Sequence, residues 1–349
     1  MSSIMNKNKD NKKKVVLNIA ILLIIVAIVL YFSLKDNFNE IMKEISKLNS
    51  LFLILGIILV LAYRFFSGLA LHTLTKTNTQ ENKLPPMNAF KLSLATMFFN
   101  GITPFATGGQ PMQLYYFKKE GVSLTQSSNI ILQNSILYQI ALIMMGTFAI
   151  ICNKTLGIFP NNDILKNLVI IGFVVNSLVC LFLFLITFGQ KFSRFILNKG
   201  LVILAKMHII KNIEDKKESL NNYITKFYES GKILIKDKKA IIKTIIFNLL
   251  SLTCLYLVPL IVIYGMGDFT SINIVEALVA SSYVMIMGAF VPTPGGTGGL
   301  EYGFINFYGY FITGSNLMAT MIIWRGITYY IGMILGGIVV AFYKGRDKK

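Results

Sequence analysis

Histidine and cysteine are scarce in this chain, with two His and three Cys among 349 residues. The cysteines, Cys152, Cys180 and Cys254, lie in or beside apolar runs, and their spacing fits neither a metal site nor a disulfide framework. Motifs of zinc proteases, P-loop nucleotide-binding proteins and serine hydrolases are also absent. The sequence therefore indicates no metal, no cofactor and no catalytic residues of these classes. We interpret the cysteines as small buried apolar residues.

Charged residues are also scarce. Only 14% of the chain is charged, against roughly a quarter in an ordinary soluble protein. Hydrophobic residues make up 54% of it, and the mean hydropathy is +0.62. A net charge of +18 would suggest nucleic-acid binding in a soluble protein. In a membrane protein, lysine-rich cytoplasmic loops account for such a charge, so we expect no direct nucleic-acid partner. The composition predicts an all-α polytopic membrane protein.

Six apolar runs are close to the roughly 20 residues that a helix needs to cross a bilayer. They are 15–34, 51–74, 126–152, 164–189, 240–265 and 317–343. Two further apolar regions, 87–117 and 272–313, are interrupted by glycine and proline, which end or kink helices. The arms of the first are too short to cross, which predicts a hairpin that enters the membrane and turns back. The second has longer arms, so two full crossings also fit, although we favour a hairpin.

The two interruptions share a pattern. Thr103-Pro104-x-x-Thr107-Gly108-Gly109 recurs as Thr293-Pro294-x-x-Thr297-Gly298-Gly299, with five positions matching in register. Paired interrupted segments in corresponding halves of a chain are a pointer to the binding site of a transporter. The alternative is that breaks rich in glycine, proline and threonine resemble one another by composition alone.

Lysine and arginine set the expected topology. With both interrupted regions as hairpins and the N-terminus in the cytoplasm, the cytoplasmic segments are 1–14, 75–87, 118–125, 190–239 and 344–349. They hold 25 of the 34 Lys and Arg residues, whereas the outer segments hold four. This bias is what the positive-inside rule requires. It predicts cytoplasmic N- and C-termini, a membrane domain over 15–343, and two hairpins related as an inverted repeat.

The 190–239 segment is the one sizeable polar region between the spans. It is predicted to form one or two amphipathic helices, with Leu197, Leu201, Leu204 and Phe227 among lysines. Such helices lie on anionic lipid head groups, or they form an ordinary solvated connector. A segment of this size is too small for a catalytic domain of usual size.

The interruptions are candidate binding elements. A helix that starts again after a break presents backbone N–H groups and the positive end of its dipole, which favours an anion such as phosphate. Gly108, Gly109, Gly298 and Gly299 would let a ligand approach the backbone closely. Thr103, Thr107, Thr293 and Thr297 would bind a polar group or satisfy the loosened backbone. The alternative is that the glycines permit tight helix packing and the prolines only kink the chain.

Ionisable residues at membrane depth are further candidates, because a lone charge in hydrocarbon is costly. Arg64 and Arg325 lie within apolar spans, and arginine can bind phosphate with two hydrogen bonds. Glu301 follows Gly298-Gly299 and is placed to pair with either arginine or with an amine on a substrate. For Arg64, a structural ion pair is an equally good interpretation.

The two interrupted segments resemble those of a known protein family. The stretches 101–116 and 290–303, above all Pro-Thr-Pro-Gly-Gly-x-Gly-Gly-x-Glu at 292–301, resemble the lysylphosphatidylglycerol synthase transmembrane-region family. These are the flippase-like domains of multiple peptide resistance factors, and the likeness covers about 15–343. In full-length members a cytosolic synthase domain follows, which uses aminoacyl-tRNA to aminoacylate phosphatidylglycerol. Here the sequence has six residues after the last span, so the resemblance implies the flippase part without the synthase part.

Together these observations favour a lipid flippase or transporter of a bacterial cytoplasmic membrane. Its partner would be a membrane phospholipid, aminoacylated phosphatidylglycerol included, with a separate lipid synthase as a further candidate partner. The rival is an enzyme, a membrane-bound phosphatidylglycerol lysyltransferase or its partner subunit, contributing to cationic peptide resistance. The rival lacks a soluble domain for the aminoacyl-tRNA. The oligomeric state is left open.

Overall fold

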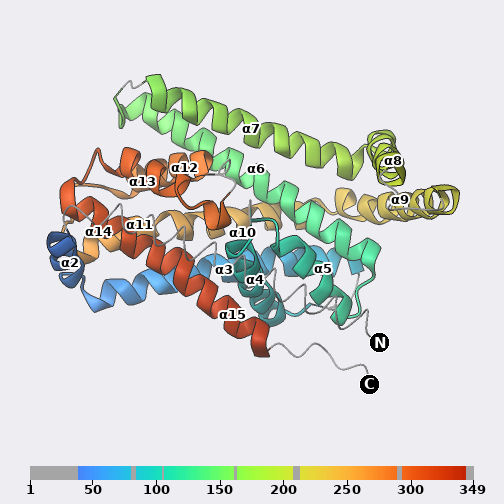
Figure 1. The fold of residues 1–349 in the computed structure, drawn as a ribbon, viewed down its shortest axis with the longest axis horizontal. Coiled ribbons are helices and arrows are strands. Elements are labelled where there is room, and N and C mark those ends of the chain that lie inside the picture. The colour runs from blue at the N-terminus through green and yellow to red at the C-terminus, as the bar shows by residue number, and fades with distance from the viewer. Residues whose placement is uncertain are drawn as a thin grey trace.

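The computed structural model describes residues 38–79, 84–103, 106–160, 163–206, 213–288 and 293–342 (Figure 1). Every regular element in this part of the chain is helical. The elements are α2 (Phe38–Ser46), α3 (Ser50–Thr79), α4 (Pro86–Gly101), α5 (Gly109–Lys119), α6 (Leu124–Leu156), α7 (Asp163–Phe188), α8 (Gln190–Lys206), α9 (Ile213–Lys236), α10 (Lys238–Tyr256), α11 (Val258–Gly265), α12 (Ile274–Gly288), η2 (Pro294–Gly296), α13 (Gly299–Tyr308), α14 (Gly314–Arg325), η3 (Gly326–Ile331) and α15 (Gly332–Phe342). The all-α prediction is confirmed.

Five helices in the described ranges are long and apolar enough to cross a membrane. They are Ser50–Thr79, Leu124–Leu156, Ile164–Phe188, Lys238–Gly265 and Gly314–Phe342. Each coincides with one of the predicted spans, because about 20 apolar residues in a row leave few alternatives to a helix. The sixth predicted span, 15–34, and the polar ends 1–14 and 344–349 lie outside the described residues.

Both interrupted regions form helical hairpins. In the first, α4 packs against α5, and in the second, α12 packs against α13. The second region is therefore a hairpin, not two crossings. The arm after the first break extends past the apolar run that ends at residue 117, since α5 runs for 11 residues and ends with Lys118 and Lys119. Basic side chains in the last turn are favoured by the helix dipole, so the helix continues past the apolar run.

The hairpins enter the bundle from opposite ends. The first begins after α3 and ends before α6, and both of these helices contact α9. There, Thr77 Oγ1 donates to Asp237 Oδ2 at 3.3 Å and Asn129 Nδ2 donates to the Phe227 carbonyl at 2.8 Å. The second hairpin lies between α11 and α14, whose outer ends are held at the α2 end (Figure 1). There, Ser315 Oγ donates to Glu40 Oε2 at 2.9 Å. The predicted inverted arrangement is present.

Each hairpin has its own apolar core. The larger cluster gathers mainly residues of α11 to α14, including Tyr283, Phe304, Phe307 and Trp324, with single residues of α3, α4 and α6 and two of α7. The second surrounds the first hairpin with residues such as Leu71, Leu92, Phe117 and Ile130. Apart from Met97, the described residues of the first hairpin do not enter the larger cluster. The polar hairpin tips therefore lie where two cores adjoin.

Two spans are interrupted in ways that the sequence analysis did not anticipate. The helix breaks between α10 and α11, just before Pro259, the second residue of α11. Proline has no N–H for the helical hydrogen bond of its turn, which accounts for the break. The last span contains the π-helical segment η3 directly after Arg325. Single-turn π segments within α-helices are often found at functional sites. The interruption widens the helix next to a buried charge.

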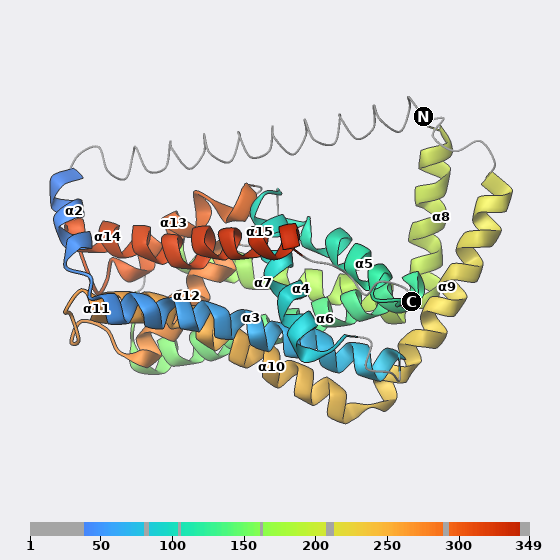
Figure 2. The same ribbon diagram turned by 90° about the horizontal axis from the view of Figure 1, so that it is seen from below.

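The helices α8 and α9 lie at the end of the bundle opposite α2 and run across its long axis (Figure 2). The buried Ile224 and Phe227 pack α9 onto the bundle, while Phe195 and Val202 of α8 are exposed. This confirms two helices within 190–239. Their contact with lipid head groups stays a prediction.

Candidate functional site

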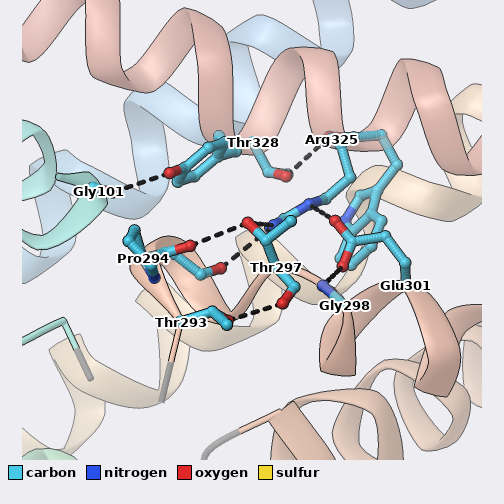
Figure 3. Close-up of polar contacts among 11 residues, drawn as sticks. Gly101, Thr293, Pro294, Thr297, Gly298, Glu301, Arg325 and Thr328 are labelled. Carbon is cyan, nitrogen blue, oxygen red and sulfur yellow. Dashed lines mark hydrogen bonds and ion pairs between the residues drawn. The ribbon is translucent and has the colours of Figure 1, made fainter. Parts of the chain in front are cut away.

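The second hairpin places a buried ion pair beside its tip. Arg325 Nε donates to Glu301 Oε1 at 2.6 Å, and the two residues are only 6% and 7% exposed. The second carboxylate oxygen of Glu301 accepts the Gly298 N–H at 2.6 Å (Figure 3). The sequence allowed Glu301 to pair with either arginine or with an amine on a substrate. In the structure it pairs with Arg325. Both carboxylate oxygens are thereby engaged within the protein.

The loop before α13 is shaped around Arg325. Its Nη2 donates to the Gly295 carbonyl and to Thr297 Oγ1, both at 3.2 Å (Figure 3). Thr297 Oγ1 in turn donates to the Pro294 carbonyl at 2.9 Å, and Thr293 Oγ1 donates to the Thr297 carbonyl at 2.7 Å. Glycine is required here because Gly295 and Gly298 have φ of 63° and 94°. The threonines of this motif therefore satisfy the loosened backbone and hold Arg325.

The first hairpin tip is closed by side chains of the same hairpin. Thr103 Oγ1 accepts the Gly108 N–H at 2.8 Å, and Asn100 Oδ1 accepts the Gly109 N–H at 2.8 Å. A methyl group on Gly109 would collide with Asn100 and Thr96. Gly108 and Gly109 are therefore tightly packed within their own hairpin, as in the packing alternative given in the sequence analysis. Thr107 is exposed at the same turn, and Pro104 lies outside the described residues.

Tyr329 connects the two hairpin tips. Its hydroxyl donates to the Gly101 carbonyl at the end of α4, at 2.8 Å. Its ring lies against Gly295, where a methyl group would meet it, and the Arg325 guanidinium carbon lies 4.7 Å from the ring centre. Tyr329, a residue of η3, therefore contacts both breaks of the sequence repeat.

A cavity of about 110 Å³ adjoins this arrangement, and both membrane-depth arginines line it. One water needs roughly 10–15 Å³ of such space, so the cavity has room for a small polar group. Its wall is largely aromatic, with Tyr63, Tyr256, Phe304, Tyr308, Trp324 and Tyr329. No Asp or Glu is among the described residues that line it.

Arg64 differs from Arg325 in having no ion-pair partner among the described residues. Its Nε is buried without a hydrogen bond, and its guanidinium carbon lies 4.2 Å from the ring centre of Tyr63. Arg325 also keeps one nitrogen, Nη1, without a hydrogen bond to the described chain. A charge at membrane depth without a counterion is costly unless a ligand supplies one. The cavity therefore has the donors for an anion.

The sequence-predicted residues thus separate into three groups. Arg64 and Arg325 line the cavity; Thr293, Thr297, Gly298, Gly299 and Glu301 form the loop and helix start beside Arg325; Thr103, Thr107, Gly108 and Gly109 lie at the other tip. The aromatic wall and Tyr329 were not predicted from the sequence, because aromatic residues in apolar spans look like core.

The sequence of this chain is similar to a known family of membrane proteins. Residues 15–336 match the family described as lysylphosphatidylglycerol synthase TM region. The chain is also similar to a protein named UPF0104 membrane protein from Archaeoglobus fulgidus, with 22% identity over 316 residues, which cover 87% of this chain and 90% of the relative. The match includes both hairpins and the residues that line the cavity, and it ends within the last membrane helix. This multi-pass membrane protein belongs to the lysylphosphatidylglycerol synthase transmembrane-region family.

Proposed function

We propose that the protein is a flippase or transporter that moves a phospholipid across a bacterial cytoplasmic membrane. The observation that carries the proposal is the convergence of Arg64 and Arg325 on one cavity. The second hairpin, α3, α10, α11 and the last span line this cavity, and Met97 is the residue that the first hairpin adds. A phosphate group at membrane depth needs fixed positive donors in place of water. Arginine supplies them in a planar array that stays charged.

The two arginines have different roles in this proposal. Arg325 is held by Glu301, Gly295 and Thr297, so its position is fixed and Nη1 remains for the lipid phosphate. Arg64 has no such restraint, and its guanidinium can follow the phosphate as it enters or leaves. Because the hairpins enter from opposite ends of the bundle, a site beside the contact of their tips suits access from either leaflet in turn.

The orientation follows from charge. The end with α8 and α9 faces the cytoplasm in the proposed topology, since 190–239 holds 12 of the Lys and Arg residues. A lipid synthase on a separate chain and an oligomeric assembly are both compatible with this placement. The lipid itself remains in the membrane throughout.

The proposal is tested in vesicles that contain the purified protein and a fluorescent phosphatidylglycerol. Lipid in the outer leaflet is bleached with a membrane-impermeant reductant, and transport appears as loss of the protected fraction. Arg64→Gln should slow this loss by about tenfold or more, because a charge-assisted contact to phosphate is removed. Lys243→Gln is the matched control: it removes a positive charge from the exposed side of α10, away from the cavity.

Equal protection with and without the protein would contradict the flippase assignment. The rival enzyme assignment has its own result: formation of lysylphosphatidylglycerol when charged tRNA is supplied. Product formation without transport would mean that the protein is a transferase and not a flippase.

A further inference from the structure

Helix α8 follows the span α7 directly and changes direction at the junction. α7 ends at Phe188 and α8 begins at Gln190, with Gly189 between them. Phe182 and Phe184 in the last turns of α7 are exposed, as expected for a helix surrounded by lipid. Figure 2 shows α8 running across the long axis of the bundle. α8 therefore starts where the hydrocarbon ends and continues along the membrane surface.

The orientation of α8 is set by its contacts with α9. The Tyr228 hydroxyl of α9 donates to the Ile186 carbonyl at 2.7 Å and lies 2.8 Å from Ser193 Oγ, which is buried. Arg194 Nη2 donates to Thr225 Oγ1 of α9 at 3.4 Å. In Figure 2, α9 lies on the outer side of α8, farther from the middle of the bundle. The face of α8 opposite Ser193 is therefore turned toward the level of the bilayer.

That opposite face combines basic and apolar side chains. It carries Lys191, Phe195, Lys199 and Val202, whose spacings of four, four and three residues place them on one side of the helix. All four are exposed, Phe195 by 57% and Val202 by 48%. Lys199 Nζ lies 4.3 Å from the centre of the Phe195 ring. Such a face suits a membrane interface, with the apolar groups at the acyl boundary and the ammonium groups among head groups.

The charge of α8 differs from that of its neighbour α9. The α8 sequence has four basic residues and no acidic one, whereas α9 has five lysines together with four acidic residues. A solvated connector has no need for this separation, and α9 has the mixed charge that such a connector would show. A helix with exposed apolar groups and only positive charge instead matches a negatively charged lipid surface.

We infer that the face of α8 formed by Lys191, Phe195, Lys199 and Val202 binds anionic lipid head groups and gathers such lipids beside α7. In the proposed topology these lipids belong to the cytoplasmic leaflet. The inference goes beyond the proposed transport and does not depend on it, because a transferase or a partner subunit with this helix would bind the same surface.

The test uses the full chain, with its native cysteines replaced, in nanodiscs of mixed phosphatidylcholine and phosphatidylglycerol. Val202→Cys carries a fluorophore on the inferred face, and Asn222→Cys carries one on the side of α9 opposite Ile224, which packs onto the bundle. A trace of either lipid with a nitroxide head group quenches a fluorophore that it contacts. Each basic residue favours an anionic surface by about fivefold, so nitroxide phosphatidylglycerol should quench position 202 about twofold or more strongly than nitroxide phosphatidylcholine. Position 222 should be quenched little by either lipid.

Two double variants with the same loss of charge assign the preference to α8. Lys191→Gln with Lys199→Gln should make the two nitroxide lipids quench position 202 equally. Lys226→Gln with Lys232→Gln is the matched control, because both lysines are exposed on α9, and it should keep the preference. Raising the ionic strength should reduce the preference in the control and in the parent chain alike, since exposed charges are screened by salt.

The contrary outcomes are distinct. Quenching at position 202 as weak as that at position 222 would mean that water or a protein partner covers α8, and would overturn the inference. Equal quenching of position 202 by the two lipids in the parent chain would mean apolar insertion without selection of anionic lipid, which overturns it as well. The same loss of preference in both double variants would assign the effect to net charge and not to the α8 face.

Discussion

The hydroxyl of Tyr329 donates to the carbonyl of Gly101, 228 residues away in the sequence, at 2.8 Å. This bond joins the end of α4, at the tip of the first hairpin, to the π-helical segment of the last span. The Tyr329 ring also lies against Gly295 of the second hairpin. One side chain thus contacts both halves of the sequence repeat.

Removing this hydroxyl should loosen the first hairpin tip. Tyr329→Phe keeps the ring in place and deletes one hydrogen bond, so the free energy of unfolding should fall by about 1 kcal/mol. Hydrogen exchange at the end of α4 should rise. Tyr330→Phe changes the neighbouring, half-buried tyrosine and should leave that exchange unaltered. Equal exchange in the two variants would mean that the bond does not hold the tip.

The ion pair of Glu301 and Arg325 should show strong coupling. Glu301→Gln leaves the Arg325 charge buried without its carboxylate, which should lower the unfolding free energy by about 3–5 kcal/mol. Adding Arg325→Gln removes the orphaned charge and should recover part of the loss. A double-mutant cycle on thermal unfolding measures the coupling. Simple addition of the two single losses would mean that the residues act independently.

Glycine substitutions should separate packing from backbone freedom. Gly109→Ala places a methyl group against Asn100 and Thr96, and should cost about 1–3 kcal/mol of stability. Gly200 lies in α8 with no atom near the position of an added methyl, so Gly200→Ala should gain about 0.5–1 kcal/mol. Chemical unfolding of the two variants in parallel gives both values. A neutral Gly109→Ala would show that the tip of the first hairpin is not tightly packed.

Labelling in whole cells should establish the orientation. In a chain whose three cysteines are replaced, Thr155→Cys marks the predicted outer side and Glu229→Cys the predicted cytoplasmic side. Both positions are exposed in the structure. A membrane-impermeant maleimide should modify position 155 in intact cells and position 229 only after lysis. The reverse pattern would overturn the charge-based topology.

The sequence was sufficient for the five spans that the structure describes and for both hairpins, because run length and glycine or proline breaks act locally. Charge at membrane depth is rare, which singled out Arg64, Arg325 and Glu301; the structure places the two arginines at the cavity and pairs Glu301 with Arg325. The sequence could not choose the partner of Glu301, which depends on how α13 meets α14. Nor could it assign Tyr329, Trp324 or Tyr63 to a cavity wall. Such residues are ordinary in an apolar helix, and only packing decides which of their faces a ligand can reach.

Close packing along α15 has a mechanical consequence. Gly332 lies against Met97 of α4, and Gly336 lies against Leu94 and Phe98 of the same helix, so a methyl group added at either glycine would collide with α4. The first hairpin is therefore packed tightly against the helix that continues from Arg325. A displacement of α4 would carry α15 with it, and the last span would pass that movement on to the guanidinium group in the cavity.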